Sequence, residues 1–329
     1  MTKILVLKQS EVEELLPMNE CISVMEEALR DLARGGVFQP LRMIVMPPDA
    51  KGGMGLMPSY RSGDRAVFGV KTVCVFPANP SKGLDSHQGN VVLFSAETGE
   101  LIALMNASAI TAIRTAAVSG VATRLLARED ADDLAIIGSG VQARTHIEAM
   151  ACVRPLKRVR VSSLRFENAK KFAEEMRPHY SFPIEPVQDV ETAVRDASLI
   201  VTATSSAQPI LKREWVSPGA HLNVVGSSVA TDREVDSATM AASSLFVDRR
   251  ESTTNEGGDY LFALRDGSID SDHIKAEIGE LLVGEKKGRS SSDEITLFKS
   301  LGLAIEDLAS AEYLYRKAQE LGRGVWVDF

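Results

Sequence analysis

The spacing of apolar residues along the chain changes repeatedly between the period of a strand and the period of a helix. Short apolar runs predict strands at 134–137, 158–163, 198–206, 219–228 and 244–249. Amphipathic stretches that separate the first three of these runs predict helices at 141–151, 167–176 and 189–197. Strands that alternate with helices in this way are typical of a parallel sheet covered on both faces.

The first third of the chain has a different pattern. The stretches "MGLMPSYRSGDRAVFGVKTVCVFPANP" and "GNVVLFSAETGELIALMNA" are rich in strand-forming residues, and "ETGE" at 97–100 predicts a hairpin turn. A helix over about 111–127 then leads into the alternating region. Residues 301–322 predict a long amphipathic helix closed by Gly322. This last helix lies outside the alternation, so we expect it to pack on the first domain.

Composition and charge exclude several classes of protein. The 329 residues suffice for two domains, and 44% apolar with 25% charged residues is typical of a soluble globular protein. The net charge of -8, without a basic run, argues against a nucleic-acid partner. No stretch reaches the roughly 18 apolar residues of a membrane span, and the start lacks a signal-peptide core. We therefore expect a cytoplasmic protein without a membrane partner.

The cysteines give no sign of a disulfide framework or a metal site. Cys21, Cys74 and Cys152 are widely scattered, and no CxxC or HExxH spacing occurs. We expect a reduced protein that holds no metal.

The segment "GSGVQA" (138–143) has the GxGxxA pattern of a dinucleotide-binding turn. Gly138 permits the tight turn, Gly140 lets the backbone approach a pyrophosphate, and the small third residue lets helix and strand pack closely. The first helical turn, with Val141 and Gln142, then presents free N–H groups to the phosphates. The pattern also occurs in turns that bind nothing, but the strand before it and the second strand after it favour a dinucleotide.

The choice between NAD and NADP stays open. Many NAD-binding proteins carry an acid for the ribose hydroxyls at the end of the second strand. This chain has "SSLR" (162–165) there, without a carboxylate. Ser163 and Arg165 could accept a 2′-phosphate, but Arg165 could equally be a solvated surface residue.

Several segments together resemble the ornithine cyclodeaminase/mu-crystallin family. They are "GLMPSY" (55–60), "GVKTV" (69–73), "ASAITAIRTAAVSGVATRLLAR" (107–128), "IIGSGVQA" (136–143), "GAHLNVVGSS" (219–228) and "LFKSLGLAIEDLA" (297–309). The resemblance implies a Rossmann-type doubly wound parallel sheet inserted in a discontinuous α+β domain that binds substrate and forms a homodimer. We expect the substrate and dimerisation domain at 1–118 plus 302–329, and the dinucleotide-binding domain at 119–301.

The resemblance also implies a substrate site and a cofactor site. Arg42, Lys71 and Arg114 match family substrate positions, and such cations can grip the carboxylate of an amino or imino acid. Lys71 and Arg114 are the expected catalytic residues, and Lys71 could also supply a proton. Ser86 and Thr115 match positions near the nicotinamide and phosphates. The remaining expected cofactor residues within the matching strands and segments are Thr204, Val225, Gly226 and Ser300.

One departure from the family pattern bears on the reaction. The cyclodeaminases carry a proton-handling aspartate after the "VG" of this strand, where the present chain has Ser228, and Asp232 comes four residues later. A serine hydroxyl stays protonated at ordinary pH and cannot replace a carboxylate base. We therefore expect the imine reductase or amino-acid dehydrogenase branch, in which NAD(P)H reduces a small imino acid, or a keto acid with ammonia.

The substrate's side chain and two rival functions remain open. Arg61 could receive the distal carboxylate of a dicarboxylic imine such as iminosuccinate, although a solvated loop arginine fits the sequence as well. One rival is an ornithine cyclodeaminase that recycles bound NAD and forms proline and ammonia. The other is a non-catalytic, mu-crystallin-like binding protein.

Overall fold

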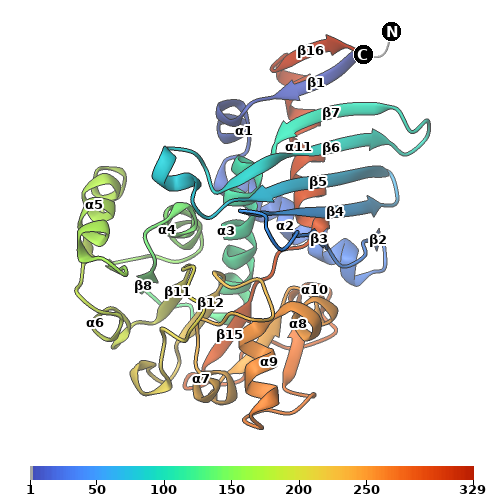
Figure 1. Cartoon of the computed structure of the whole chain (residues 1–329). Helices are drawn as coiled ribbons and strands as arrows, with labels where there is room; N and C mark the ends of the chain where they lie inside the picture. The colour runs from blue at the N-terminus through green and yellow to red at the C-terminus, as the bar shows by residue number, and fades with distance from the viewer. Residues whose placement is uncertain (1–2) are drawn as a thin grey trace. The chain divides into compact units, whose positions relative to one another are not determined.

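The computed structural model describes residues 3–329 and divides the chain into two compact units. Unit 1 comprises Met1–Arg114 and Leu303–Phe329, and unit 2 comprises Thr115–Gly302. The first unit is thus built from both ends of the chain, and the second is an insertion within it (Figure 1).

Unit 1 is built on a mixed, mainly antiparallel sheet of eight strands. Its order is β16 (Val325–Asp328), β1 (Lys3–Leu7), β7 (Leu101–Asn106), β6 (His87–Ser95), β5 (Val67–Val75), β4 (Gly53–Arg61) and β2 (Val37–Phe38), with β3 (Met43–Val45) also paired to β4. The expected turn joins β6 to β7, and only the β1–β7 pair is parallel.

The last long helix, α11 (Ala304–Leu321), packs on this sheet, as expected from the sequence. It lies against β4, β5 and β6 and beside α2 (Met18–Ala33). The helix approaches the sheet closely where Gly69 leaves room, since an added Cβ there would lie 2.5 Å from Leu308 Cδ1. The helix ends at Gly322, whose φ of 63° is left-handed, and such a position favours glycine. The other helical elements of the unit are α1 (Gln9–Leu15), η1 (Asn79–Lys82) and the start of α3 (Ala107–Leu126).

Unit 2 is a parallel, eight-stranded sheet with helices between successive strands. Its order is β10 (Ile184–Pro186), β9 (Arg158–Ser162), β8 (Asp133–Ile137), β11 (Leu199–Thr202), β12 (His221–Val224), β15 (Thr296–Lys299), β13 (Ser244–Val247) and β14 (Ile274–Glu277). The helices are α4 (Val141–Val153), α5 (Phe166–Met176), α6 (Val190–Val194), α7 (Ser237–Ala242), α8 (Arg250–Glu256), α9 (Gly258–Arg265) and α10 (Ile278–Leu282), with the short turns η2 (Arg177–His179) and η3 (Arg213–Trp215).

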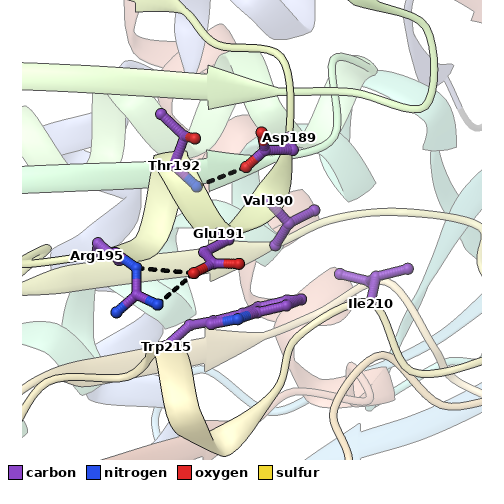
Figure 2. Close-up of a pocket in the computed structure, with 7 residues that line it drawn as sticks. All are labelled: Asp189, Val190, Glu191, Thr192, Arg195, Ile210 and Trp215. Carbon is purple, nitrogen blue, oxygen red and sulfur yellow. Dashed lines mark hydrogen bonds and ion pairs between the residues drawn. The ribbon is translucent and has the colours of Figure 1, made fainter.

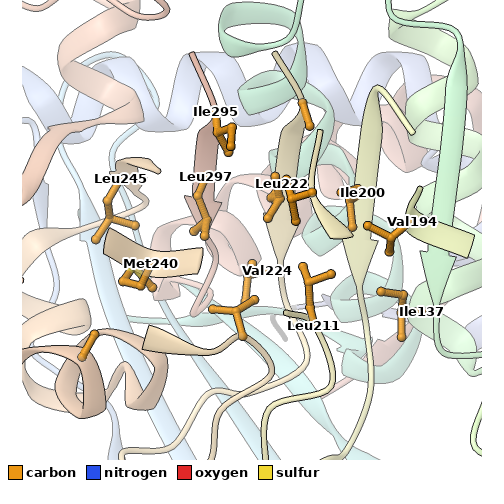
Figure 3. Packing of buried hydrophobic residues seen from close by; sticks show 14 of the residues in the cluster. Ile137, Val194, Ile200, Leu211, Leu222, Val224, Met240, Leu245, Ile295 and Leu297 are labelled. Carbon is orange, nitrogen blue, oxygen red and sulfur yellow. The ribbon is translucent and has the colours of Figure 1, made fainter. Parts of the chain in front are cut away.

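The core of unit 2 is formed by apolar side chains of adjacent parallel strands. Figure 3 shows Ile200, Leu222 and Leu297 from β11, β12 and β15 gathered in one layer. All three are fully buried, which agrees with the continuous apolar runs in the sequence.

The fold class predicted from the sequence is confirmed, with differences in the elements. Helix α3 begins at Ala107 rather than near residue 111, and α6 covers only five residues of the expected 189–197 helix. Strands β10, β14 and β15 were not predicted as separate strands. Helix α3 is also long and apolar enough to cross a membrane, but 78% of its most apolar window is buried inside the protein, as in a core helix.

Candidate functional site

Two of the three expected substrate cations lie together inside unit 1. Lys71 extends from β5, and Arg114 extends from α3. Their exposed fractions are only 3% and 4%. Burying a charge is costly unless it is paired, so the structure must supply counter-charges.

The counter-charges come from the first turn of α11. Asp307 Oδ2 lies 2.6 Å from Lys71 Nζ, and Asp307 Oδ1 accepts a hydrogen bond from Arg114 Nε at 3.0 Å. Arg114 Nη1 donates to Glu306 Oε2 at 2.6 Å. Both carboxylates are buried, so the four side chains form a compact cluster, which we call the acid–base cluster.

Glu306 and Asp307 were missed in the sequence. They stand in "LAIED" as acids in the first turn of a helix, where negative charge is common because it complements the helix dipole. Their only distinguishing signal is that they sit on a helix that begins within a buried, apolar stretch.

The cluster changes how its members titrate. Burial lowers the pKa of Lys71 to about 8, with Asp307 opposing the change and Arg114 and Arg42 adding to it. Burial acts against the charged form of Arg114 too, but the two carboxylates outweigh it and raise its pKa. Arg42, in the loop before β3, is therefore within electrostatic range of Lys71. The structure brings the three expected substrate cations into one region.

His87, at the start of β6, also belongs to this region. Partial desolvation, followed by the charges of Lys71 and Arg114, lowers its pKa, although the residue as a whole is exposed. Ser86 Oγ lies 3.0 Å from His87 Nδ1, which places the expected cofactor residue Ser86 at the same strand end.

Arg61 is not available in the way the sequence suggested. Its Nε donates to Asp31 Oδ2 at 2.8 Å, a second nitrogen contacts the same oxygen, and Nη1 lies 3.9 Å from Glu312. Arg61 also lies away from Lys71, because Lys71 pairs in register with Met57 whereas Arg61, four residues further along β4, pairs with Val67. We therefore leave Arg61 out of the substrate site.

In unit 2, the glycine corner has the geometry that a dinucleotide needs. Gly138 has a φ of +117°, and an added Cβ would lie 2.4 Å from the backbone oxygen of Ala203. Gly140 is different, because it is extended and an added Cβ would meet no atom within 4 Å. The backbone of Gly140, at the start of α4 with Val141 and Gln142, therefore faces open space. The donors and the room suit a pyrophosphate.

The neighbouring strand ends are fixed by one buried carboxylate. Glu234 accepts hydrogen bonds of 2.7 Å from Thr202 Oγ1, from both the backbone N–H and the hydroxyl of Thr204, and from Gly226 N. An added Cβ on Gly226 would lie 2.2 Å from the Thr204 oxygen. The backbones of Thr204 and Gly226, two expected cofactor residues, are thus closely packed, and the buried Val225 adjoins Gly226.

A buried ion pair between Lys299 and Asp259 lies beside the Glu234 carboxylate. Lys299 Nζ is 2.8 Å from Asp259 Oδ2, with both side chains fully buried. Asp259 Oδ1 accepts from the backbone of Glu234 at 2.7 Å. The adjacent Ser300 is buried, and its N–H donates to Val224 at 3.1 Å. Burial raises the pKa of Glu234, and Lys299 counteracts this.

The remaining expected cofactor residues lie at two further places in unit 2. Ser163 Oγ lies 2.9 Å from Ser139 Oγ, so the end of β9 contacts the glycine corner. Arg165 is exposed just beyond it, and Thr115 is buried within α3. Among residues 3–329, no group of three or more His, Cys, Asp or Glu could hold a metal ion.

The hollow at α6 contains none of the expected residues (Figure 2). It has a volume of about 420 Å³ and is lined by Asp189, Val190, Glu191, Thr192, Arg195, Ile210 and Trp215. Its carboxylates are occupied, since Asp189 caps α6 through Thr192 N and Glu191 pairs with Arg195. This hollow is therefore not our candidate site.

Comparison with known proteins finds relatives that match nearly the whole chain. The Thermococcus litoralis Delta(1)-pyrroline-2-carboxylate reductase, solved with NADH and L-proline, has a TM-score of 0.96 and 42% identity, covering 98% of this chain and 100% of its own. An archaeal alanine dehydrogenase dimer with bound NAD has a TM-score of 0.93 and 34% identity, covering 100% of both chains. The ketimine reductase mu-crystallin of Mus musculus is 39% identical over 89% of this chain and 90% of its own.

These relatives are reductases or dehydrogenases acting on imine or amino groups, and the solved ones hold NAD or NADH. The model of one family matches residues 2–322, which is nearly the whole chain. The chain belongs to the ornithine cyclodeaminase/mu-crystallin family.

Proposed function

We propose that this protein is an enzyme that reduces a small monocarboxylic imino acid to an amino acid, with NADH or NADPH as the reductant. The observation that carries the proposal is the convergence of Arg42, Lys71 and Arg114 on one region of unit 1. Pyrroline-2-carboxylate and related ketimines are the first substrates to consider, because reductases of these compounds are similar to this chain.

The roles follow from the chemistry of each group. Arg114 and Arg42 bind the substrate carboxylate through charge-assisted hydrogen bonds. Lys71 donates the proton that the imine nitrogen gains as its carbon–nitrogen double bond becomes a single bond. Its pKa of about 8 lets it carry that proton near neutral pH and release it readily. When bound, a reduced nicotinamide would supply the hydride that the imine carbon gains.

Unit 2 is the proposed holder of the cofactor. Gly138, Gly140 and the first turn of α4 bind the pyrophosphate, and Thr204, Val225 and Gly226 line the adjacent strand ends. The end of β9, with Ser163 and Arg165, has no carboxylate that would repel a 2′-phosphate. We therefore propose that the protein accepts NADPH as well as NADH.

A monocarboxylic substrate fits the charges better than a dicarboxylic one. Iminosuccinate would bring a second carboxylate, for which Arg61 was the expected partner. Arg61 is paired with Asp31 and lies four residues along β4 from Met57, the register partner of Lys71, which is roughly 13 Å at the rise of a strand. A distal carboxylate on a small substrate held at Lys71 would therefore not reach it.

The experiment is a panel of reductions followed by the absorbance of the reduced nicotinamide. Pyrroline-2-carboxylate, a six-membered cyclic imino acid, pyruvate with ammonia and oxaloacetate with ammonia are each given with NADH and with NADPH. We expect the cyclic imino acids to react fastest. Ammonia release from ornithine without net cofactor change would show a cyclodeaminase, and cofactor binding without any turnover would show a binding protein.

Two variants test the substrate site. Arg42→Ala and Lys71→Ala should lower turnover by roughly a hundredfold or more while NADH affinity stays near that of the wild type. The control is Lys51→Ala, which removes an exposed lysine of the same unit. Full activity in both site variants would contradict the assignment.

We further propose that the protein is a homodimer formed through unit 1. Phe38, Met43, Ile44 and Met46 on and near β2 and β3 have exposed fractions of 72%, 61%, 54% and 67%. An exposed apolar strand is a liability unless another surface covers it. Light scattering should give twice the mass of the chain, and Ile44→Asp should shift it toward the mass of one chain.

A further inference from the structure

The acid–base cluster contains a carboxylate whose two oxygens serve both proposed substrate cations. We propose that Asp307 is a positioning residue for the reduction: it holds the Lys71 ammonium beside the Arg114 guanidinium and keeps Lys71 in its proton-donating form. This inference rests on the proposed function and goes beyond it, since no role for α11 enters the mechanism above.

The contacts of Asp307 are divided between its oxygens. Oδ2 is 2.6 Å from Lys71 Nζ, and Oδ1 is 3.0 Å from Arg114 Nε. Asp307 is 1% exposed, so water screens neither contact. One buried carboxylate therefore holds together the two cations that would bind and protonate the substrate.

Glu306 provides an internal comparison. It contacts Arg114 Nη1 at 2.6 Å, whereas Asp307 is the acid whose charge acts most strongly on Lys71. The two adjacent acids thus share one cation but differ at Lys71, so their removal should have different effects on proton donation.

The groups that face Lys71 come from every neighbouring element. Arg114 on α3, Arg42 in the loop before β3 and His87 on β6 are cationic or can become so, while Asp307 on α11 is the opposing charge. Thr111 Oγ1, 3.5 Å from Lys71 Nζ, is uncharged. Burial and the arginines favour loss of the proton, and Asp307 opposes them. Without Asp307, Lys71 would lose its proton at a lower pH.

The test is the pH dependence of kcat for pyrroline-2-carboxylate reduction in wild type, Asp307→Asn and Glu306→Gln. In the wild type we expect kcat to fall as the pH rises through about 8. Asp307→Asn should move this fall to lower pH by roughly one unit or more, since a nearby opposite charge shifts a pKa by that amount. Glu306→Gln should leave the fall in place and raise the substrate KM.

The inference would be overturned if kcat of folded, active Asp307→Asn fell at the same pH as in the wild type. It would also be overturned if Glu306→Gln shifted this pH by as much as Asp307→Asn does. If Asp307→Asn does not fold, Asp307→Glu carries the test, because it keeps the charge but displaces the carboxylate. We then expect a lower kcat with the fall in its wild-type place; an unchanged kcat would overturn the positioning role. A wild type that reduces no imino acid would overturn the proposed function and this inference together.

Discussion

Glu234 Oε2 accepts a hydrogen bond from the backbone N–H of Gly226 at 2.7 Å, in the loop that follows β12. The same carboxylate binds Thr204, so it fixes the two loops in which the proposed cofactor residues lie. Those loops leave β11 and β12 at the carboxyl edge of the sheet, where parallel sheets bind their ligands.

Replacing Glu234 should therefore damage cofactor binding. In Glu234→Gln, the new amide would turn a donor toward a backbone N–H, so one of the present hydrogen bonds is lost. We expect stability to fall by about 3 kcal/mol and the Kd for NADH to rise by roughly tenfold. Calorimetric titration with NADH measures the second effect.

The matched control is Asp133→Asn, at the amino end of β8 in the same sheet. Asp133 begins β8 and pairs with Arg158 and Arg160. It should lose stability without a change in NADH affinity. A Glu234→Gln protein that binds NADH as well as Asp133→Asn does would show that Glu234 is purely structural.

The two glycines of the corner should respond differently to substitution. Gly140→Val should leave the melting temperature almost unchanged, because an added Cβ would meet no atom within 4 Å, but it should weaken NADH binding at least roughly tenfold. Gly138→Ala should destabilise the fold itself, because the φ of +117° disfavours a side chain and the new Cβ would lie 2.4 Å from the backbone oxygen of Ala203. Thermal melts with and without NADH separate these effects. Equal losses of stability in the two variants would contradict the assignment.

Arg165 should distinguish the two cofactors. It is exposed at the end of β9, where an arginine can pair with a 2′-phosphate. Arg165→Ala should raise the KM for NADPH about tenfold and leave the KM for NADH within about twofold. Equal effects on both cofactors, or none on either, would remove Arg165 from the cofactor site.

Acid should destabilise unit 2 through two buried histidines. Burial lowers the pKa of His146 to about 4 and that of His221 to about 3. In the unfolded chain these histidines have a pKa of about 6.5. Below that pH the unfolded chain therefore binds protons that the buried histidines of the folded protein do not bind. Stability is then full above about pH 6.5 and falls as the pH drops toward these lowered values, by about 1.4 kcal/mol per pH unit for each histidine.

Urea unfolding from about pH 7 to about pH 5 measures this slope. His146→Asn should reduce it, because one of the two titrating rings is removed. The control is His179→Asn, which removes an exposed ring and should leave the slope as in the wild type. Identical slopes in His146→Asn and wild type would contradict the assignment.

The sequence predicted those parts of the molecule that are encoded locally. The glycine corner could be recognised because Gly138, Gly140 and the start of α4 are consecutive in the chain. The parallel sheet followed from the alternation of apolar runs and amphipathic stretches. The long closing helix was found from its periodicity and from Gly322.

Partnerships between distant residues could not be predicted in the same way. Arg114 and Asp307 are 193 residues apart, and Arg61 and Asp31 are 30 apart on different elements. A sequence shows the charge of each residue but not which opposite charge is buried against it. For this reason Glu306 and Asp307 were missed, and the pairing of Arg61 with Asp31 was not predicted.

The position of α11 after unit 2 in the sequence also bears on the order in which the protein is made. Unit 2 is contiguous, so every residue it needs has been synthesised once Gly302 is added. Lys71 and Arg114 are made much earlier, and their carboxylate partners follow only after the whole of unit 2. Until then, the sheet of unit 1 lacks both its covering helix and the charges that neutralise its interior. The proposed substrate pocket is thus completed only after the cofactor domain has been synthesised.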